Sequence, residues 1–478
     1  MTEESNFNPR ALYAERIGGE KFGTDDTVYK FEKIKRARVG FEKAEAAKAA
    51  KDSSYTPVKV LNVGVGEHDG MPAEIVRDAL APCNFQRILN EMGYLEGQPI
   101  EMTPEFIAEV EAKLLEGEVH SPANKGYPDN GILEFQQASA QYVNNLLGTS
   151  IPTGGDAAQH VLHRFGSKTL LSLLATPFIN PGDATVMTTP GYGVAGTNTK
   201  YMGGQVLNLP LTAANGFLPD LNDLENTVAL FNRDPNGSKV KMVVLNYPNN
   251  PTGADAPQEF WDEVAGIANH HNCMVVQDMA YPWNYTGKQP ASILSAKGGD
   301  QCGAAIFSLS KAFNMIGYRG AQIVSANPDL IAPLAEVKDN QDSGQWAAIQ
   351  RAGIVAMENP WITDQIAEKY QRRLEGMVGV LNKFGFDAEM PDGTFFLYTP
   401  SPTGAAGEKF KTAEDASQYF LKNQGVSVVP WDDVGNFLRF SATFSAGDPF
   451  LLKGDPKADE EVLAELDSRL EKAEFVFN

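Results

Sequence analysis

The stretch Ala304-Ala305-Ile306-Phe307-Ser308-Leu309-Ser310-Lys311 decides the fold class of this 478-residue chain. Its apolar half predicts a strand buried on both faces, and its polar half ends on two serines and a lysine. Arg319 follows eight residues after Lys311. In an open α/β sheet, ligands bind at the edge formed by the carboxyl ends of the strands. The stretch therefore predicts a cationic patch that can hold a phosphate and also carry a reactive amine.

Further apolar runs on the amino-terminal side of this stretch alternate with helical segments such as 258–270. The runs are continuous rather than alternating, which is typical of strands covered on both faces of a mostly parallel sheet. They span residues 184–187, 205–207, 240–245 and 274–276. The pattern predicts an α/β fold with a mostly parallel sheet and flanking helices.

The rest of the chain differs from this central part. Residues 1–57 form a polar N-terminal arm in which 31–51 predict a charged helix. Residues 126–345 are expected to form the large α/β domain. Residues 58–125 and 346–478 are expected to form a small α+β domain with an elaborated segment at 83–120, where Thr103 can cap a helix that begins with Pro104. Strands are predicted at 58–63, 395–398, 426–429 and 437–440, and helices at 364–384 and 459–473.

Composition excludes several classes of partner. A net charge of −21 repels nucleic-acid phosphates and anionic membranes, so neither is expected as a partner. The three cysteines Cys83, Cys273 and Cys302 have no paired spacing, which indicates a reducing compartment. The N-terminus lacks the features of a signal peptide, and no run approaches ~18 apolar residues, so we expect a cytoplasmic protein. His160 and His163 can share a helix face, but no acidic or cysteine cluster completes a metal site, and no metal is predicted.

Three polar segments lie where ligands would bind to such a sheet. Gly166-Ser167-Lys168-Thr169 precedes a helical run, so its backbone amides can hold a phosphate or simply begin a helix. Tyr192 follows the strand at 184–188 and can stack on a planar ring or lie half-buried in a turn. Asn250 lies in the rigid loop 246–253, where its amide can meet a ligand oxygen or serve only the turn.

A carboxylate ends the predicted strand at 274–276. Burying Asp278 there is costly unless the carboxylate has a partner, which can be a cationic ring nitrogen or a nearby Arg or Lys. Tyr281, three residues later, can direct its hydroxyl to the same ligand.

Together these motifs resemble the pyridoxal-phosphate site of the fold-type-I aminotransferases of the aspartate aminotransferase superfamily. The resemblance covers about residues 58–478 and rests on Asn249-Asn250-Pro251-Thr252-Gly253, Asp278-Met279-Ala280-Tyr281 and Ser308-Leu309-Ser310-Lys311 with Arg319, in the family's order. It implies a homodimer with shared active sites, and an amino acid and a keto acid as substrates.

The resemblance also implies a role for each matching residue. Lys311 would form the internal Schiff base and act as general base, and Asp278 would keep the pyridine nitrogen protonated. Arg439 would clamp the substrate α-carboxylate. The other implied contacts are the ring oxygen for Asn250 and Tyr281, the ring face for Tyr192, the phosphate for Ser167, Lys168, Ser308, Ser310 and Arg319, the partner subunit's phosphate for Tyr127, and the substrate for Gly66 and Asn250.

Longer stretches resemble one subgroup, the LL-diaminopimelate aminotransferases. They include Tyr127-Pro128-Asp129-Asn130-Gly131 and Ser310-Lys311-Ala312-Phe313-Asn314-Met315. The subgroup's reaction converts tetrahydrodipicolinate and glutamate to LL-diaminopimelate and 2-oxoglutarate in lysine biosynthesis. Tyr318 stands where a tryptophan is more usual, so aspartate or another amino acid stays open as the donor. Glu67 and Asp69 can meet a distal ammonium or form a solvated pair.

Three other classes of protein stay open. A pyridoxal-phosphate lyase or decarboxylase on the same fold would share the cofactor residues. A regulator would need a DNA-binding module, for which residues 1–57 are short and the basic run at 33–38 lacks a partner helix. A cofactor-free structural protein is the third.

Overall fold

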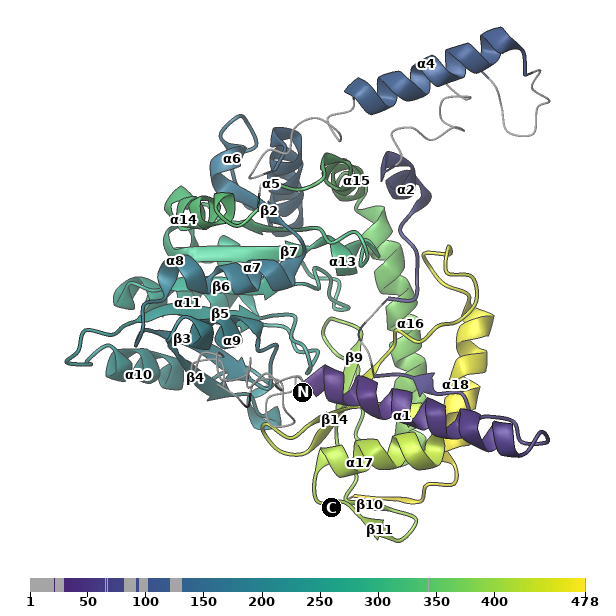
Figure 1. Cartoon of the computed structure of the whole chain (residues 1–478). Coiled ribbons are helices and arrows are strands. Elements are labelled where there is room, and N and C mark those ends of the chain that lie inside the picture. The colour runs from purple at the N-terminus through teal and green to yellow at the C-terminus, as the bar shows by residue number, and fades with distance from the viewer. Residues whose placement is uncertain are drawn as a thin grey trace, which may run out of the picture.

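The computed structural model describes residues 21, 30–64, 66, 68–80, 92–93, 102–120, 131–342 and 344–477. Within them, a seven-stranded sheet lies beside a C-terminal part made of short sheets and long helices (Figure 1). The helices described before residue 121 are α1 (Lys30–Lys51), α2 (Glu74–Leu80) and α4 (Pro104–His120). The amide of Phe106 donates to Thr103 Oγ1 at 3.1 Å, which confirms the predicted cap of α4.

The large sheet has the strand order β2-β8-β7-β6-β5-β3-β4. Neighbouring strands are parallel except that β8 runs antiparallel to both β7 and β2. The strands are β2 (Val161–Arg164), β3 (Ala184–Thr189), β4 (Gln205–Pro210), β5 (Val240–Asn246), β6 (Met274–Met279), β7 (Gly303–Ser308) and β8 (Ala321–Val324). The predicted class, a mostly parallel sheet with flanking helices, is confirmed.

Helices cover both faces of this sheet, and alternate residues of each central strand point into different cores. In β5, Met242 and Val244 belong to one apolar cluster, whereas Val243 and Leu245 belong to the other. The first cluster is completed by α7 (Ser167–Leu173), α8 (Ala175–Phe178), α9 (Val194–Tyr201) and α14 (Pro328–Asp339). The second is completed by α5 (Leu133–Leu147), α10 (Leu221–Phe231), α11 (Gln258–His271) and α15 (Ala347–Met357). This double burial explains the continuous apolar runs.

Short connecting elements complete the large part. They are α6 (Ala157–His160), η4 (Ala213–Asn215), η5 (Ile293–Ser295), α12 (Gly299–Cys302) and α13 (Leu309–Ala312). His160 ends α6 whereas His163 lies in β2, so the prediction that they can share a helix face was wrong. In the described part of the chain, no cluster of three or more His, Cys, Asp or Glu side chains is arranged to hold a metal ion.

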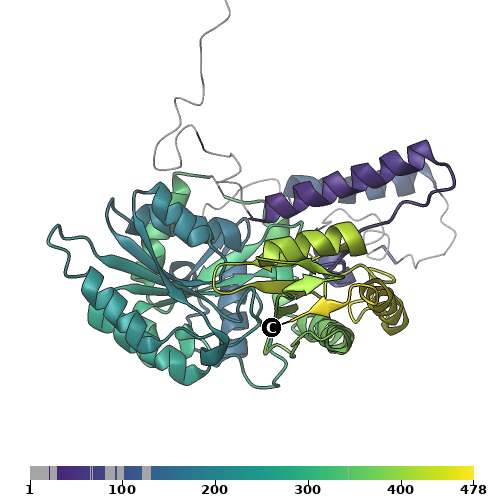
Figure 2. The same ribbon diagram turned by 90° about the horizontal axis from the view of Figure 1, so that it is seen from below.

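The C-terminal part contains a three-stranded antiparallel sheet ordered β13-β14-β9. A parallel pair joins β1 to β12, which ties residues 61–62 to this part of the chain. Its elements are β1 (Leu61–Asn62), α16 (Trp361–Lys383), β9 (Phe396–Pro400), β10 (Gly404–Ala405), β11 (Glu408–Lys409), α17 (Ala413–Tyr419), the π-helical turn η6 (Phe420–Gln424), β12 (Val426–Ser427), β13 (Val429–Trp431), β14 (Phe437–Ser441), α18 (Pro456–Leu470) and β15 (Phe475–Val476). In Figure 2, α1 lies along the outside of this part rather than over the large sheet. The division into domains at residues 126 and 345 stays a prediction.

Two expectations about strands were incomplete or wrong. The runs that form β2 and β8 were not predicted, because four-residue strands carry little periodic signal. The run at 205–207 was expected to be buried on both faces, but β4 is the edge strand and most of its residues are partly or fully exposed. Among the described helices, none combines the length and the apolar character needed to cross a membrane.

Candidate active site

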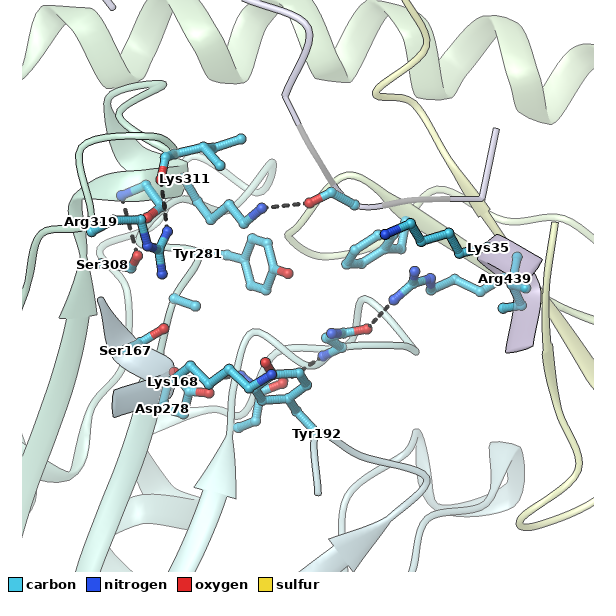
Figure 3. A pocket seen from close by; sticks show the side chains of 18 of the residues that line it. Lys35, Ser167, Lys168, Tyr192, Asp278, Tyr281, Ser308, Lys311, Arg319 and Arg439 are labelled. Atoms are coloured by element: carbon cyan, nitrogen blue, oxygen red, sulfur yellow. Dashed lines mark hydrogen bonds between the residues drawn. The ribbon is translucent and has the colours of Figure 1, made fainter. Parts of the chain in front are cut away.

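The carboxyl ends of β5, β6 and β7 meet at one edge of the large sheet and open into a cavity of about 670 Å³ (Figure 3). Asn246 at the end of β5 is the neighbour of Asp278 in β6, so the two polar side chains are brought together by strand register. The cavity is lined by Ile34, Lys35, Arg38, Asn62, Gly66, Ser167, Lys168, Tyr192, Asn246, Asn250, Asp278, Ala280, Tyr281, Ser308, Ser310, Lys311, Ile316, Arg319, Phe396 and Arg439. Every predicted site residue that the structure describes lies in this wall. Tyr127 falls outside the described residues.

Asp278 is a deeply buried residue of the cavity wall. Its side chain is 4% exposed, and among the described residues Oδ1 has no hydrogen-bond partner. Burial raises the pKa of Asp278 to about 7, because ionisation would place an uncompensated charge in an apolar environment. Among the residues that the structure describes, no Arg or Lys donates to Asp278 Oδ1, so the cationic protein partner that the sequence left open is not found there. Asn246 holds the backbone by donating from Nδ2 to the Asp278 carbonyl at 2.7 Å.

Lys311 lies just after the carboxyl end of β7, on the short helix α13. The helix begins because the Ser308 hydroxyl caps it and accepts from the amide of Ser310 at 3.2 Å. The Lys311 ammonium donates from Nζ to the Gly66 carbonyl at 2.5 Å and lies 5.5 Å from the centre of the Phe395 ring. The lysine therefore points across the cavity towards the segment that follows β1.

Cationic and hydroxyl groups gather at one end of the cavity. Ser167 and Lys168 form the first turn of α7, and Arg319 lies next to that turn. A Cβ at Gly166 would come within 2.5 Å of Arg319 Nη2, so glycine leaves the space that the guanidinium occupies. Arg319 itself has φ 59°, an uncommon backbone conformation for a residue other than glycine, and its Nη1 donates to the Ile316 carbonyl at 2.7 Å. This end has the groups that bind phosphate.

Arg439 lies at the other end, on β14. It is 1% exposed, donates from Nη1 to Asn250 Oδ1 at 2.6 Å and from Nη2 to the Gly64 carbonyl at 2.8 Å. Its guanidinium also lies 4.0 Å from the centre of the Phe396 ring. A buried, oriented guanidinium of this kind suits a carboxylate ligand.

Aromatic side chains complete the walls between these two ends. Tyr281 is buried and lines the cavity, and Tyr192 lines the side nearest Lys168 (Figure 3). Gly66 must lack a side chain, because a Cβ there would lie 2.8 Å from Phe396 Cζ. The predicted residues thus surround a space with one end that suits a phosphate, another end that suits a carboxylate, and the Lys311 amine between them.

Sequence reasoning missed several lining residues, above all Lys35 and Arg38 from α1. The basic run at 33–38 was weighed only as a DNA-binding signal, and its helical pattern alone does not show what the helix packs against. Asn62 and Phe396 were missed for the same reason, since each comes from a strand in the C-terminal part of the fold.

The suggestion that Asp69 meets a substrate ammonium or forms a solvated pair with Glu67 was wrong for Asp69. Its carboxylate is buried and accepts from Lys369 Nζ at 2.9 Å and Arg373 Nη2 at 2.9 Å, so its charge is compensated inside the protein. Arg373 also donates from Nε to Asp459 Oδ1 at 2.7 Å. Glu67 falls outside the described residues.

Comparison with known proteins identifies the family. The family model for class I and II aminotransferases matches residues 89–448. The chain belongs to the class I and II aminotransferases. The aminotransferase is 43% identical over 471 residues to the LL-diaminopimelate aminotransferase of Methanocaldococcus jannaschii, and the match covers 98% of each chain. It is 39% identical to the protein of that name from Methanococcus maripaludis, again over 98% of each chain.

More distant relatives match a shorter part of the chain. The LL-diaminopimelate aminotransferase of Moorella thermoacetica is 34% identical over 71% of this chain and 82% of its own length. Among solved structures, substrate-bound BacF from Bacillus subtilis is 25% identical with a TM-score of 0.68 over 91% of this chain and 95% of its own. The aspartate aminotransferase of Rhizobium meliloti shares the fold, with a TM-score of 0.73 at 20% identity over 98% of this chain and 100% of its own.

As a member of this family, the enzyme depends on pyridoxal 5′-phosphate. The residues of the cavity fit this cofactor. A protonated ring nitrogen would give Asp278 Oδ1 the partner that the described residues do not supply. The guanidinium of Arg319, held against Gly166, suits a phosphate. An amino acid and a keto acid are the substrates of this reaction class.

Proposed function

We propose that this aminotransferase transfers the amino group of glutamate to tetrahydrodipicolinate, forming LL-diaminopimelate and 2-oxoglutarate in lysine biosynthesis. The observation that carries the proposal is the 43% identity to an LL-diaminopimelate aminotransferase over 98% of both chains. So complete a match includes most of the N-terminal arm and the elaborated segment, and not only the cofactor-binding core. We also propose that the enzyme works in the cytoplasm.

The residues around the cavity support a division of labour. Pyridoxal phosphate, when bound, supplies an aldehyde that links covalently to the substrate amine and a ring that withdraws electrons from the substrate Cα. Asp278 would hold a proton on the ring nitrogen. The groups proposed to hold the phosphate are Ser167, Lys168, Ser308, Ser310 and Arg319. Asn250 and Tyr281 would bind the ring oxygen, and Tyr192 would cover the ring face.

Lys311 and Arg439 would then act on the substrate itself. Arg439 would bind the α-carboxylate with two parallel hydrogen bonds, beside Asn250 and Gly66, and so fix the direction of the Cα–H bond. Lys311, as a neutral amine, would remove the proton from the substrate Cα. Positioned proton transfer of this kind contributes about 10²–10⁴-fold to the rate.

A homodimer is part of the proposal. Support comes from exposed apolar side chains in and just before α2 and in the segment that contacts it, where Arg77 of α2 lies over the Phe450 ring. They are Met71 (38%), Ile75 (40%), Phe450 (53%) and Leu451 (48%). Exposed apolar side chains gathered in this way are typical of protein interfaces. Tyr127 is proposed to reach the phosphate in the partner subunit. Light scattering of the purified protein would show a mass of about twice 51.9 kDa, and a monomer would contradict this part.

The substrate is tested by reverse transamination. The holoenzyme is mixed with LL-diaminopimelate and 2-oxoglutarate, and glutamate formation is measured beside parallel reactions with aspartate and with alanine as donors. We expect LL-diaminopimelate to react with the highest kcat/KM. A higher kcat/KM for aspartate would replace the proposed substrate with aspartate while leaving the transaminase reaction in place.

A further inference from the structure

Helix α1 carries two cations into the wall of the active-site cavity, Lys35 and Arg38. The helix is placed there by Ile34, which is buried in a cluster with Val429 and Trp431 of β13. Val429 is the cross-strand partner of Arg439. The residue that follows Ile34 is therefore held close to the carboxylate-binding end of the cavity, and Figure 3 shows Lys35 directed into the cavity from the same side as Arg439.

The other end of α1 is fixed by Glu45. This buried carboxylate accepts from the Tyr55 hydroxyl at 2.6 Å and from the Val58 amide at 2.9 Å, and it pairs with Lys48 at 2.6 Å. Val58 precedes β1, whose Asn62 lines the same cavity. The helix is thus attached at both ends to strands that form the site, so its cations have a defined position.

The charges in the cavity are unbalanced. Among the described residues, the lining of the cavity includes six cations and one acid, in a protein whose net charge is −21. The cations are Lys35, Arg38, Lys168, Lys311, Arg319 and Arg439, and the acid is Asp278. Lys168 and Arg319 lie at the phosphate end, Lys311 is the reactive amine, and Arg439 is matched to one carboxylate. Lys35 and Arg38 are left over, and a substrate with a single carboxylate would leave both uncompensated.

Within the described part of the chain, Lys35 has no ion pair and Arg38 has only a weak one. Lys35 is an exposed residue that lines the cavity, and it makes no hydrogen bond or ion pair with the described residues. Arg38 has only a long contact with Glu42, 3.9 Å from Nε to Oε1, and among the described residues that buried Nε has no hydrogen-bond partner. Both are therefore available to a second negative group on the ligand.

We propose that Lys35, assisted by Arg38, binds the distal carboxylate of dicarboxylic substrates such as glutamate and LL-diaminopimelate. The inference rests on the proposed function in one respect, namely that Arg439 takes the α-carboxylate. Lys35 is then a specificity-determining residue, because it distinguishes substrates by the group farthest from the reacting Cα.

Ligand binding tests this without amino-group transfer. Calorimetric titrations of the holoenzyme compare glutarate, a five-carbon dicarboxylate without an amine, with pentanoate, which lacks the second carboxylate. One charge-assisted contact corresponds to about 10–100-fold in Kd. We expect wild type to bind glutarate tighter by about that factor, and K35A and K35Q to reduce the difference to about 3-fold or less. K35R should keep most of it, and R38A should lose part.

Lys33→Ala is the matched control, because Lys33 is an exposed lysine of the same helix that does not line the cavity. It should bind both ligands like wild type. The proposal is overturned if wild type does not prefer glutarate, or if K35A keeps the preference. Loss of binding for both ligands in K35A would also overturn it, since that indicates a role in positioning Arg439.

Half-reactions of the holoenzyme give an independent readout. Glutamate and alanine are mixed separately with each variant, and the change in cofactor absorbance is followed. K35A should lower the rate constant per unit concentration for glutamate by about 10–100-fold and leave that for alanine within about 2-fold. If glutarate discrimination depends on Lys35 but LL-diaminopimelate is not a substrate, the proposed function fails while this inference stands.

Discussion

Arg439 of β14 and Asn250 of the loop after β5 are joined by a hydrogen bond of 2.6 Å, although 189 residues separate them in the sequence. A second bond to the Gly64 carbonyl and the ring of Phe396 hold the same guanidinium. Three separate segments of the chain therefore orient one cation before a substrate arrives. Such preorganisation reduces the entropy that binding must otherwise cost.

Replacing this arginine by lysine should weaken substrate binding more than it slows the chemistry. In Arg439→Lys the charge remains, but the planar pair of donors is lost, so KM for the amino donor should rise about 10–100-fold. Steady-state kinetics measure this, with Arg233→Lys, an exposed arginine outside the cavity, as the control. An unchanged KM would show that the α-carboxylate binds elsewhere.

Removing the reactive amine should abolish turnover without unfolding the protein. Lys311→Ala removes the group proposed to move the Cα proton, so kcat should fall by about 10²–10⁴-fold or more. The circular-dichroism spectrum should match that of wild type. Lys297→Ala, an exposed lysine outside the cavity, should retain full activity. Turnover close to wild type in Lys311→Ala would contradict the assignment.

The buried carboxylate should make the cofactor-free protein less stable as the pH rises. Because the folded-state pKa of Asp278 is about 7 and the unfolded value is about 3.9, the folded protein holds an extra proton between these values. The free energy of unfolding should therefore fall as the pH rises from about 4 to about 7. Asp278→Asn removes this titration, so the cofactor-free variant should be more stable than wild type near pH 8 by a few kcal/mol, and similar to it near pH 4.

Urea denaturation at both pH values, with and without pyridoxal phosphate, measures these differences. The cofactor should stabilise wild type more than Asp278→Asn, because only the carboxylate gains a charged partner. Asp387→Asn, at an exposed position, should change neither profile. Equal stability of wild type and Asp278→Asn at both pH values would refute the prediction.

The buried ion pairs around Asp69 should contribute strongly to stability. Asp69→Ala leaves Lys369 and Arg373, both at most 1% exposed, without this partner. Removing one member of such a cluster costs about 3–5 kcal/mol. The control is Glu368→Ala, which breaks an exposed pair with Lys453 and should cost about 1 kcal/mol or less. A similar small loss in both variants would show that Asp69 is not needed to compensate these charges.

Much of the cofactor site could be predicted from local sequence. Asp278, Ser308 and Lys311 each follow an apolar run, and the ends of parallel strands meet at one edge, so their proximity followed from the fold class. Asp69 and Lys35 could not be predicted in this way. Both lie in polar segments, and a polar residue in such a segment is equally compatible with solvent, a buried ion pair or a cavity wall.

By itself, the sequence determined the alternation of strands and helices, the family, and the residues expected around the cofactor. These depend on short-range patterns: apolar runs for buried strands, and motifs at the strand ends. Only the tertiary structure decided that, among the residues it describes, Asp278 Oδ1 has no hydrogen-bond partner. It also decided that Lys369 and Arg373 compensate the charge of Asp69, and that α1 brings Lys35 beside Arg439. The physical reason is that a residue's own segment sets its local conformation, whereas its charge environment is set by distant segments that pack against it.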